Sequence, residues 1–541
     1  MINEMKKMLL HILLLCLQPK AFAQLPANFL PPTGTEHLRI YTDRNCYVAG
    51  EIIWLNIKVI SGTEAPSSEI GYVDLLNPYT ATPVLQAKIN LHNGEAFLQL
   101  PDSISTGNYV VRAYTRHSPE AQAPIMIVNT LRDSIVDTHL FNVTSTTHPA
   151  ILSTEHSYGR RMPVDMSVQL PIHTQEAYAS VYLYDACEQS AATINLLPNT
   201  SLPAIPPTWK ETAGQVITGT IIDSTGQPLR VPVYLTVTGS RPKFYCQSSS
   251  DSGHFAFELL AYSGDANILL LAATKNYQIN VQTPFHPLAQ QAPTPHAEGT
   301  QPVDTALLNA LLQRHIAMQV QQAYFHDSTL LADDPFADSI LFFGKPDEQV
   351  LLDDYTRFNT VEEIFREFIK TTMVRREGNT LHLHTLNNVL ANPKFFEQDP
   401  LVLVDGVPVF DNQRLFALAP LKIRKVSVLA RKVFFPGQYF YGIVSLQSYA
   451  GDLAGYPLDP HALVVDYSGT QLPLHFFSPA YDHHQSPTLP DQRTLLYYNH
   501  QVPVNADGTA HLHFYTGDLP GIYRVVVRGA DTTISQYLEV Q

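Results

Sequence analysis

Short runs in which apolar and polar residues alternate fill most of the chain, and Pro or Gly residues separate these runs. Residues 53–59 place Ile, Leu, Ile and Val at every second position, and residues 421–428 follow a similar pattern. A period of two predicts β-strands that bury one face, because successive side chains of a strand point to opposite sides. The pattern therefore predicts a mainly β protein, built as a string of antiparallel β-sandwich domains.

The best-defined strand pair is expected at residues 400–410. Two apolar runs meet there at Asp405-Gly406. This dipeptide between apolar runs indicates a hairpin with a type I′ turn, since that turn needs positive φ at both central residues. Pro408 should keep the second strand short, because proline cannot donate a hydrogen bond to a neighbouring strand.

Two segments break the β pattern with helical spacing. In residues 305–324, apolar residues recur every three or four positions, which predicts a helix that packs on a neighbouring unit. Residues 361–369 predict another helix, in which Thr360 is the N-cap and Glu363 completes a capping box. The apolar stripe expected to face a core consists of Val361, Ile364, Phe365 and Phe368.

The elements around the hairpin follow the order strand, Asp-Gly turn, short helix, amphipathic strand, Gly turn and strand. With the Asp405-Gly-Val-Pro408 turn and the Tyr441-Gly-Ile-Val444 run, this order resembles the plug domain of TonB-dependent outer-membrane receptors. The resemblance implies a small α+β plug-like domain, inserted before a C-terminal sandwich. Such receptors continue with a barrel of about 22 strands, whereas 91 residues follow position 450 here. The chain is therefore not expected to be a transporter by itself.

A different pair of motifs stands near the N-terminus. Tyr41-Thr-Asp-Arg44 precedes Tyr47-Val-Ala-Gly-Glu51, and a Gly-x-Tyr strand opens at Gly107. These segments resemble the macroglobulin-type domain of alpha-2-macroglobulins, which implies an antiparallel β-sandwich. The Gly-Cys-Gly-Glu-Gln thioester of the protease-trapping members is not in the sequence, so covalent protease capture is not expected. A second Gly-x-Tyr strand at Gly521 indicates an immunoglobulin-like or macroglobulin-like sandwich at the C-terminus.

The middle of the chain carries further strand signals. Residues 215–229 give a strand, an Asp-x-x-Gly turn and a proline, a layout similar to the carboxypeptidase regulatory-like domain, which is a seven-stranded sandwich without chemistry of its own. The expected units are a signal peptide at 1–23, a linker at 24–36, the macroglobulin-type sandwich at 37–130, a second sandwich with a Pro-rich linker at 131–213, the regulatory-like sandwich at 214–285, a helix-rich connector at 286–345, the plug-like domain at 346–455 and the C-terminal sandwich at 456–541.

The first residues predict export. Two lysines, the largely apolar residues 8–17 and the small-residue site Ala21-Phe-Ala23 together predict a secretory signal peptide cleaved before Gln24. Lipid attachment at Cys16 is the alternative, and the missing small residues before Cys16 argue against it. Since the rest of the chain has no apolar run of about 18 residues, we expect no transmembrane segment in the mature chain. The expected location is the periplasm or the outer membrane, with an extracellular location as the alternative.

Net charge limits the classes of partner that we expect, and cysteine content limits the expected disulfides and metal sites. The formal net charge of −15 argues against nucleic acid and anionic lipid, because phosphate groups are bound by clustered Lys and Arg. Cys46, Cys187 and Cys246 remain after cleavage, and their odd number and wide spacing match neither a disulfide framework nor a metal pattern. Each is therefore expected to be a small buried hydrophobic residue.

Three groups of histidines invite a metal hypothesis. His382 and His384 alternate along an expected strand, as do His511 and His513, and alternating residues share one face, a geometry that zinc can use. The third group is His475, Asp482, His483 and His484. With 22 histidines in the chain such pairs arise by chance, so we assign no metal site. Whether the loop from His475 to His484 binds a metal stays open.

No constellation of residues names a reaction. The acidic pairs Asp333-Asp334 and Asp353-Asp354 are adjacent in sequence, whereas acid–base catalysis needs carboxylates that face one another across a cleft. Nucleophile-elbow, zinc-protease, phosphate-loop and dinucleotide motifs are missing from the sequence. We therefore assign no catalytic residue and no cofactor.

With these three resemblances taken together, the chain is similar to exported multidomain proteins of Gram-negative bacteria. They imply a non-enzymatic interaction or scaffold protein of the cell envelope, which binds other envelope proteins through its β-domains. An accessory of an outer-membrane TonB-dependent transport complex, with a receptor as partner, is the second hypothesis. A secreted hydrolase of unknown type is the third.

Overall fold

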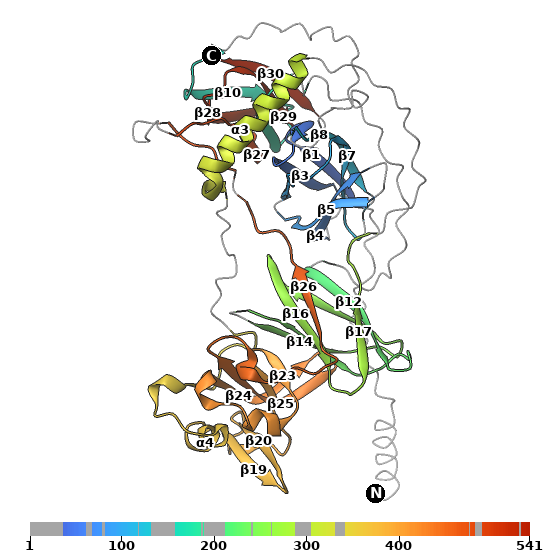
Figure 1. The fold of residues 1–541 in the computed structure, drawn as a ribbon, viewed down its shortest axis with the longest axis vertical. Helices are drawn as coiled ribbons and strands as arrows, with labels where there is room; N and C mark the ends of the chain where they lie inside the picture. Colours follow the sequence, from blue (N-terminus) through green and yellow to red (C-terminus); the bar gives the residue numbers. More distant parts are fainter. Residues whose placement is uncertain are drawn as a thin grey trace, which may run out of the picture.

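The computed structural model is mainly β and combines four β units with one long helix (Figure 1). It describes residues 36–60, 68–77, 82–92, 94–116, 118, 120–130, 157–185, 188, 211, 213–239, 242–260, 262–286, 305–329, 341–474, 476–481, 489–529 and 532–541. We name the units the N-terminal unit (36–130), the split unit (157–185 with 489–541), the middle unit (213–286 with 463–470) and the hairpin unit (341–456).

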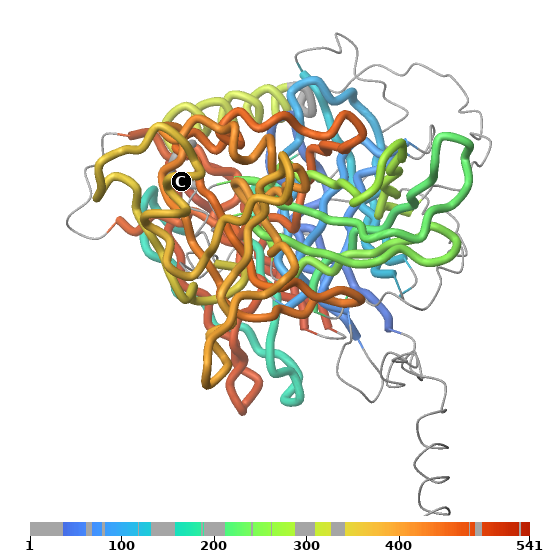
Figure 2. Tube along the Cα trace, turned by 90° about the horizontal axis from the view of Figure 1, so that it is seen from below, coloured from blue at the N-terminus to red at the C-terminus, as the bar shows by residue number. Residues whose placement is uncertain are grey.

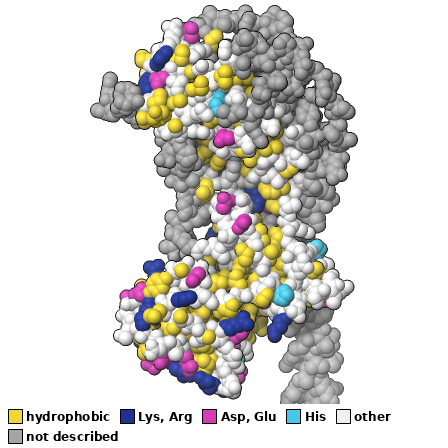
Figure 3. All heavy atoms as spheres, in the orientation of Figure 1, with side chains coloured by type: hydrophobic (Ala, Val, Ile, Leu, Met, Phe, Trp, Pro, Cys, Tyr) yellow, Lys and Arg dark blue, Asp and Glu magenta, His cyan; other side chains and the backbone are white. Residues whose placement is uncertain are grey.

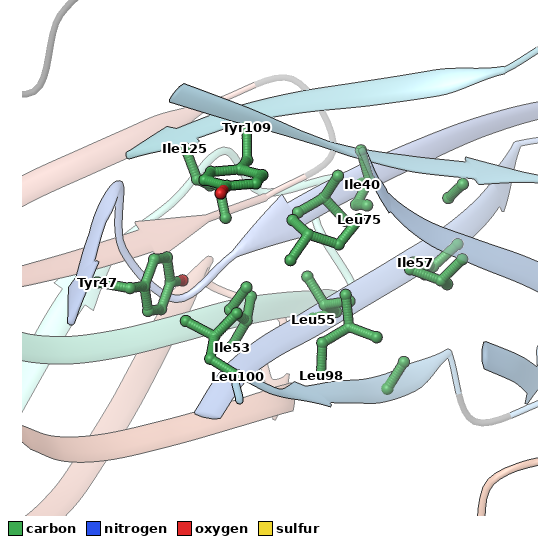
Figure 4. Close-up of a cluster of buried hydrophobic side chains, with 14 of the residues drawn as sticks. Ile40, Tyr47, Ile53, Leu55, Ile57, Leu75, Leu98, Leu100, Tyr109 and Ile125 are labelled. Atoms are coloured by element: carbon green, nitrogen blue, oxygen red, sulfur yellow. The ribbon is translucent and has the colours of Figure 1, made fainter. Parts of the chain in front are cut away.

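The N-terminal unit is a sandwich of two sheets. One sheet has the order β1 (His37–Thr42), β3 (Ile52–Ile60) and β6 (Glu95–Gln99), and the other has the order β2 (Cys46–Val48), β8 (Ala121–Val128), β7 (Gly107–Tyr114), β4 (Ile70–Asn77) and β5 (Thr82–Asn90). Ile53, Leu55 and Ile57 lie in the core between the sheets, as their alternation predicts (Figure 4). Trp54 and Asn56 are buried on the other face of β3, because the split unit covers that face.

Two distant segments of the chain build the split unit. Its five-stranded sheet has the order β27 (Leu495–Pro503), β11 (Glu176–Leu183), β29 (Gly521–Arg528), β30 (Thr533–Val540) and β9 (Ser157–Tyr158), and β10 (Pro163–Gln169) pairs with β28 (Thr509–Tyr515). Both segments contribute to one core. Our expectation of separate sandwiches at 131–213 and 456–541 is therefore wrong here. A few strands cannot bury their apolar faces alone, and the C-terminal strands supply the missing cover.

The middle unit has seven strands, of which six lie within the range 214–285 that we expected for the regulatory-like sandwich. One sheet has the order β15 (His254–Leu260), β12 (Gly214–Asp223) and β17 (Tyr277–Val281), and the other has the order β14 (Lys243–Ser248), β13 (Pro232–Val237), β16 (Asp265–Ala272) and β26 (Leu463–Ser468). We expected β26 in the C-terminal sandwich, but it pairs with β16 in the register Leu270↔Leu463. Its Leu463, Val465 and Tyr467 thereby pack against the core of the middle unit.

The hairpin unit is the α+β part of the chain. Its main sheet has the order β18 (Glu348–Leu351), β24 (Ile423–Phe435), β25 (Gln438–Ser448), β22 (Leu401–Val404) and β23 (Val407–Val409), and a second sheet contains β19 (Thr372–Glu377), β20 (Thr380–Asn387) and β21 (Lys394–Phe395). The helical elements are η2 (Leu352–Asp354), α4 (Val361–Glu367), α5 (Asn412–Phe416), η3 (Pro420–Lys422) and η4 (Leu453–Gly455).

Local predictions for the hairpin unit are confirmed. Asp405 and Gly406 have φ values of 49° and 82° between the paired β22 and β23, as a type I′ turn requires. The Asp405 carboxylate also accepts hydrogen bonds from the Ser448 and Leu453 amides. Thr360 and Glu363 form the capping box of α4.

The units form two halves along the long axis of the molecule (Figure 1). The N-terminal and split units share one half with α3 (Thr305–Thr329), and the middle and hairpin units form the other half. Figure 2, which looks along this axis, shows the hairpin unit in orange beside the middle unit in green. The helix α3 covers the predicted residues 305–324. Leu311, His315 and Met318 of its apolar stripe are buried, whereas Leu312 is exposed.

Candidate functional site

The two N-terminal motifs meet in a buried group of charged side chains, which we name the ion cluster: Asp43, Arg44, Glu51, Glu188 and Arg314. Asp43 and Arg44 follow β1, and Glu51 lies between β2 and β3. Glu188 follows the split unit's β11, and Arg314 comes from α3. The cluster thus lies where the N-terminal unit, the split unit and α3 meet.

The residues of the two N-terminal motifs interact with one another. Asp43 Oδ1 accepts hydrogen bonds from the Tyr47 hydroxyl at 2.7 Å and from the Trp54 amide at 2.9 Å. Arg44 Nη2 lies 3.4 Å from Glu51 Oε1. Arg44 also donates to Thr494 Oγ1 of the split unit at 2.9 Å. The motifs therefore close the corner between β1 and β3 and attach it to the neighbouring unit.

Arg314 completes the cluster from outside the motifs. Its Nη2 donates to the Cys46 carbonyl at 2.7 Å and lies 3.3 Å from Glu51 Oε2. Its Nη1 lies 3.7 Å from Glu188 Oε1. The Glu188 carboxylate accepts a hydrogen bond from the Cys46 amide at 3.0 Å. One guanidinium thus connects α3 to two β units.

Burial controls the electrostatics of the cluster. It raises the pKa of Glu188 to about 7, although Arg314 acts in the opposite direction. Burial also raises the pKa of Asp43. For Arg314, burial disfavours the charge, but Glu51, Asp185 and Glu188 raise its pKa above the usual value. Since Arg44 and Arg314 are both buried, the cluster is suited to holding units together.

A second polar group lies between the N-terminal and middle units, and we name it the Glu211 cluster: Tyr72, Lys88, Arg116 and Glu211. Glu211 accepts a hydrogen bond from the Tyr72 hydroxyl at 2.7 Å and lies 3.2 Å from Arg116 Nε. Lys88 Nζ donates to the Ser468 carbonyl at 2.8 Å and stands 3.8 Å from the centre of the Tyr467 ring. Burial lowers the pKa of Lys88 to about 7.

A small cavity lies between the same two units. Its volume is about 250 Å³, and its lining includes Asn90, Gln215, Tyr262 and Gln471. Gln215 and Gln471 are already used: Gln215 donates to the Tyr262 carbonyl, and Gln471 donates to the Phe97 carbonyl. The hydrogen bond from Gln471 therefore connects the two units, whereas the one from Gln215 lies within the middle unit.

The two members of each histidine pair have different surroundings in the structure. His382 Nδ1 lies 2.9 Å from Asp399 Oδ2, while His384 is buried. His511 Nδ1 lies 3.0 Å from Ser167 Oγ, and His513 Nδ1 lies 2.7 Å from Asp165 Oδ1. Within the part of the chain that the structure describes, no group of three or more His, Cys, Asp or Glu could hold a metal ion.

Other candidate residues are only partly covered by the structure. His475, Asp482, His483 and His484 lie outside the described residues, as do Asp333 and Asp334. Asp353 is exposed and accepts hydrogen bonds from Arg357 and Tyr449. These hydrogen bonds, from Tyr449 first, lower the pKa of Asp353, as in a carboxylate with a structural role.

The cysteines differ from our expectation. Cys46 is disulfide-bonded, so our expectation that each cysteine is only a small buried hydrophobic residue is wrong for Cys46. An odd number of cysteines does not exclude a disulfide, because one cysteine can stay unpaired. Cys246 is that free, buried residue, and burial raises its pKa to about 12. Cys187 lies outside the described residues.

Sequence reasoning missed the residues that close the two clusters. One signal was available for Arg314, because it stands three residues after Leu311 and four before Met318, on the stripe expected to be buried. Lys88 and Glu188 gave no comparable signal, since their burial depends on units that are distant in sequence.

Comparisons with known proteins place the chain in no family. No family model and no curated protein matches it. Among solved structures, the native conformation of E. coli alpha-2-macroglobulin matches with 11% identity and a TM-score of 0.24, covering 95% of this chain and 40% of that chain. A Salmonella alpha-2-macroglobulin mutant matches with 10% identity and a TM-score of 0.24, covering 94% and 39% of the two chains. This chain therefore spans about 40% of the length of these matches.

Tandem immunoglobulin domains of titin match with 10% identity and a TM-score of 0.13, covering 46% of this chain and 95% of that chain. Among the helices in the described ranges, none is both long enough and apolar enough to cross a membrane.

Proposed function

We propose that this protein is a non-enzymatic scaffold of the cell envelope, which binds other envelope proteins through its β-domains. The observation that carries the proposal is the position of the buried charges. The ion cluster joins the N-terminal unit, the split unit and α3, and the Glu211 cluster joins the N-terminal and middle units. Buried charges used in this way fix the relative positions of units, which is what a scaffold requires.

Edge strands offer a means of binding. β19 ends its sheet, and four of its six residues are exposed. An extended segment of a partner can pair with the backbone of such an edge and form an additional strand. The disulfide at Cys46 supports export, because disulfides persist in oxidising compartments.

A pull-down tests the proposal. The mature protein is immobilised and exposed to solubilised outer membranes, with Arg314→Met as the test variant and Arg230→Met as the control. Arg230 is exposed and lies outside both the ion cluster and the edge strand β19. If the fixed arrangement matters, several envelope proteins should bind the wild type and the control, and fewer should bind Arg314→Met. Retention of no envelope protein would contradict the scaffold function.

The accessory of a TonB-dependent transport complex is the second candidate. The hairpin unit supports it, because β22, the Asp405-Gly406 turn, β23, α5, β24 and β25 follow the expected order. Capture of one receptor in stoichiometric amount would favour this candidate over the scaffold.

The hydrolase is the third candidate, and elemental analysis decides its metal-dependent form. We expect the mature protein, purified without chelator, to hold no stoichiometric metal and to show no hydrolytic activity. One equivalent of zinc that is lost in His483→Ala or His484→Ala would make the loop from His475 to His484 a site. The hydrolase would then become the first hypothesis.

A further inference from the structure

The long hairpin of β24 and β25 has two different faces in its outer half. On one face, Phe435 and Phe440 pack against Phe244 and neighbouring residues of the middle unit. The side chains of the other face point away from this contact, and Phe434 is 76% exposed. The hairpin is therefore held rigidly from one side and presents its other side to solvent.

Large apolar side chains lie on this face and on the neighbouring segment 389–396, and we name them the aromatic patch: Val389, Leu390, Phe395, Phe396, Phe434, Tyr439 and Tyr441. Phe434 lies opposite Tyr439 in the strand register. The ring of Tyr441 lies 5.5 Å from that of Tyr439 and 5.4 Å from that of Phe396. The Asn388 amide donates to the Ala430 carbonyl at 3.0 Å, which brings the adjoining Val389, itself 74% exposed, to the same strand.

Three cations accompany the aromatic patch. Lys432 lies opposite Tyr441, with its Nζ 3.8 Å from the centre of the Tyr439 ring. Arg431 precedes it in β24, and Lys394 begins β21 beside Phe395. All three are exposed, and none forms an ion pair with an acidic side chain among the described residues. Asp399, which follows the patch in sequence, is held by His382 and Asn412.

The charge of the chain is unevenly distributed. Residues 341–456 contain 13 Lys and Arg and 13 Asp and Glu, so the whole net charge of −15 lies outside the hairpin unit. Figure 3 shows dark blue side chains among yellow ones on the visible surface of that half of the molecule. The acidic net charge therefore does not describe the surface around the aromatic patch.

We propose that the aromatic patch docks on the surface of an anionic phospholipid bilayer. Exposed aromatic and aliphatic side chains enter the interface between headgroups and acyl chains, where Tyr keeps its hydroxyl in the polar layer. Lys and Arg place their stems along this layer and their charges beside lipid phosphates. The exposed Lys394, Arg431 and Lys432 supply the matching charge. This proposal departs from our expectation that the acidic net charge argues against anionic lipid, and it is independent of the proposed scaffold function.

An acidic protein is the competing partner. The patch favours a bilayer, because its most exposed residues, Phe434 and Val389, project from a hairpin and a loop, and a protein interface would bury such anchors in a pocket. The lipid proposal also explains why cations and aliphatic residues occur together, since each interacts with a different layer of a bilayer.

Vesicle sedimentation tests the proposal. The mature protein is mixed with vesicles of phosphatidylglycerol and phosphatidylcholine, and with vesicles of phosphatidylcholine alone. We expect binding to the anionic vesicles that weakens at high salt, and at least tenfold weaker binding to the neutral ones. Equal binding to both, or binding to neither, would overturn the proposal, and the second result would leave the acidic protein as the partner.

Two variants connect the binding to the patch. Arg431→Gln with Lys432→Gln should weaken partitioning by about 30-fold, at about fivefold for each charge removed. The control, Arg375→Gln with Arg376→Gln, makes the same charge change at β19, where acidic neighbours already lie close to both arginines. Equal losses in both pairs would show that only the total charge matters and would overturn the assignment of the face.

A spectroscopic variant reports insertion directly. Phe434→Trp places an indole at the most exposed large apolar residue of the hairpin, where the wild-type side chain is already exposed and folding should be unaffected. Its fluorescence emission should shift to shorter wavelength with anionic vesicles and be quenched by brominated lipid. Unchanged emission from vesicle-bound protein would show that another face binds.

Discussion

Two junctions of this molecule hold units together by opposite means. The ion cluster joins the N-terminal unit, the split unit and α3 through Arg44, Arg314 and their carboxylates. The middle and hairpin units meet instead in an apolar junction, whose buried members include Tyr234, Phe244, Leu269, Leu403, Phe440 and Ile443. In the ion cluster, the charges and the directions of the hydrogen bonds determine which side chains pair. In the apolar junction, stability depends on how well the side chains fill the space between the two units.

This difference predicts different responses to mutation and pH. A buried ion pair contributes little net stability compared with apolar packing, but the loss of one partner leaves an uncompensated charge. An apolar junction loses stability in proportion to the volume removed. In the apolar junction, burial raises the pKa values of Tyr234 and Cys246 to about 12, whereas the pKa of Glu188 in the ion cluster is about 7. Between pH 5 and pH 8, pH should therefore affect the ion cluster and leave the apolar junction unchanged.

Arg314→Met should have the largest effect. It leaves the carboxylates of Glu51 and Glu188 buried without their shared cation, which costs about 3–5 kcal/mol in the free energy of unfolding. Urea unfolding at pH 7.5 measures the loss, with the exposed Arg375→Met as the control. A loss below about 1 kcal/mol would mean that water reaches the ion cluster, and the contrast between the junctions would disappear.

Leu403→Ala should be the next largest change. Leu403 is fully buried in the apolar junction, and the cavity left by its side chain costs about 2–5 kcal/mol. The loss should be the same at pH 5 and pH 8, because the junction contains no carboxylate that titrates there. A loss that changes between these pH values would show that the apolar junction is coupled to the ion cluster.

The sequence predicted the apolar elements well because their signal is local. Alternation placed the strands, Asp405-Gly406 placed a turn with positive φ, and Thr360 with Glu363 placed the start of α4. Each of these predictions depends on residues that are close together in the sequence. The macroglobulin-type motifs were also noticed locally, although their role in the ion cluster was not.

Connections between distant segments could not be predicted in this way. Nothing in β10 or β11 reveals that strands more than 300 residues later complete their sandwich. The burial of Glu188 and Lys88 likewise arises only after units assemble. Such contacts depend on which faces remain uncovered within each unit, and a single sequence does not identify the segment that covers them.

The variant Glu188→Gln tests the difference between the two junctions through the pH dependence of stability. Burial raises the pKa of Glu188 from 4.5 to about 7, so folding favours its protonated form. The resulting stability is fully present below pH 4.5 and is lost as the pH rises through about 7. Glutamine removes this dependence, so the variant should gain about 3 kcal/mol relative to the wild type between pH 4.5 and 8.

Unfolding free energies of both proteins across this pH range provide the measurement. Glu377→Gln, an exposed position in β19, serves as the matched control, and its difference from the wild type should be independent of pH. If Glu188→Gln behaves like this control, Glu188 does not carry the pH response of the ion cluster.

Gly406→Val should have the smallest effect, a loss of about 1–3 kcal/mol in the free energy of unfolding. This variant also distinguishes backbone strain from steric contact at the apolar junction. Gly406 has a φ of 82°, and a Cβ there would lie 2.4 Å from Pro242 Cβ of the middle unit. Gly378 has a φ of 60° with nothing within 4 Å of the same position, so Gly378→Val measures strain alone. The Gly406 variant should therefore lose more stability than the Gly378 variant, and thermal unfolding of the two full-length proteins measures the difference. Equal losses would mean that the turn does not press against the middle unit, and the junction would then depend on its core residues alone.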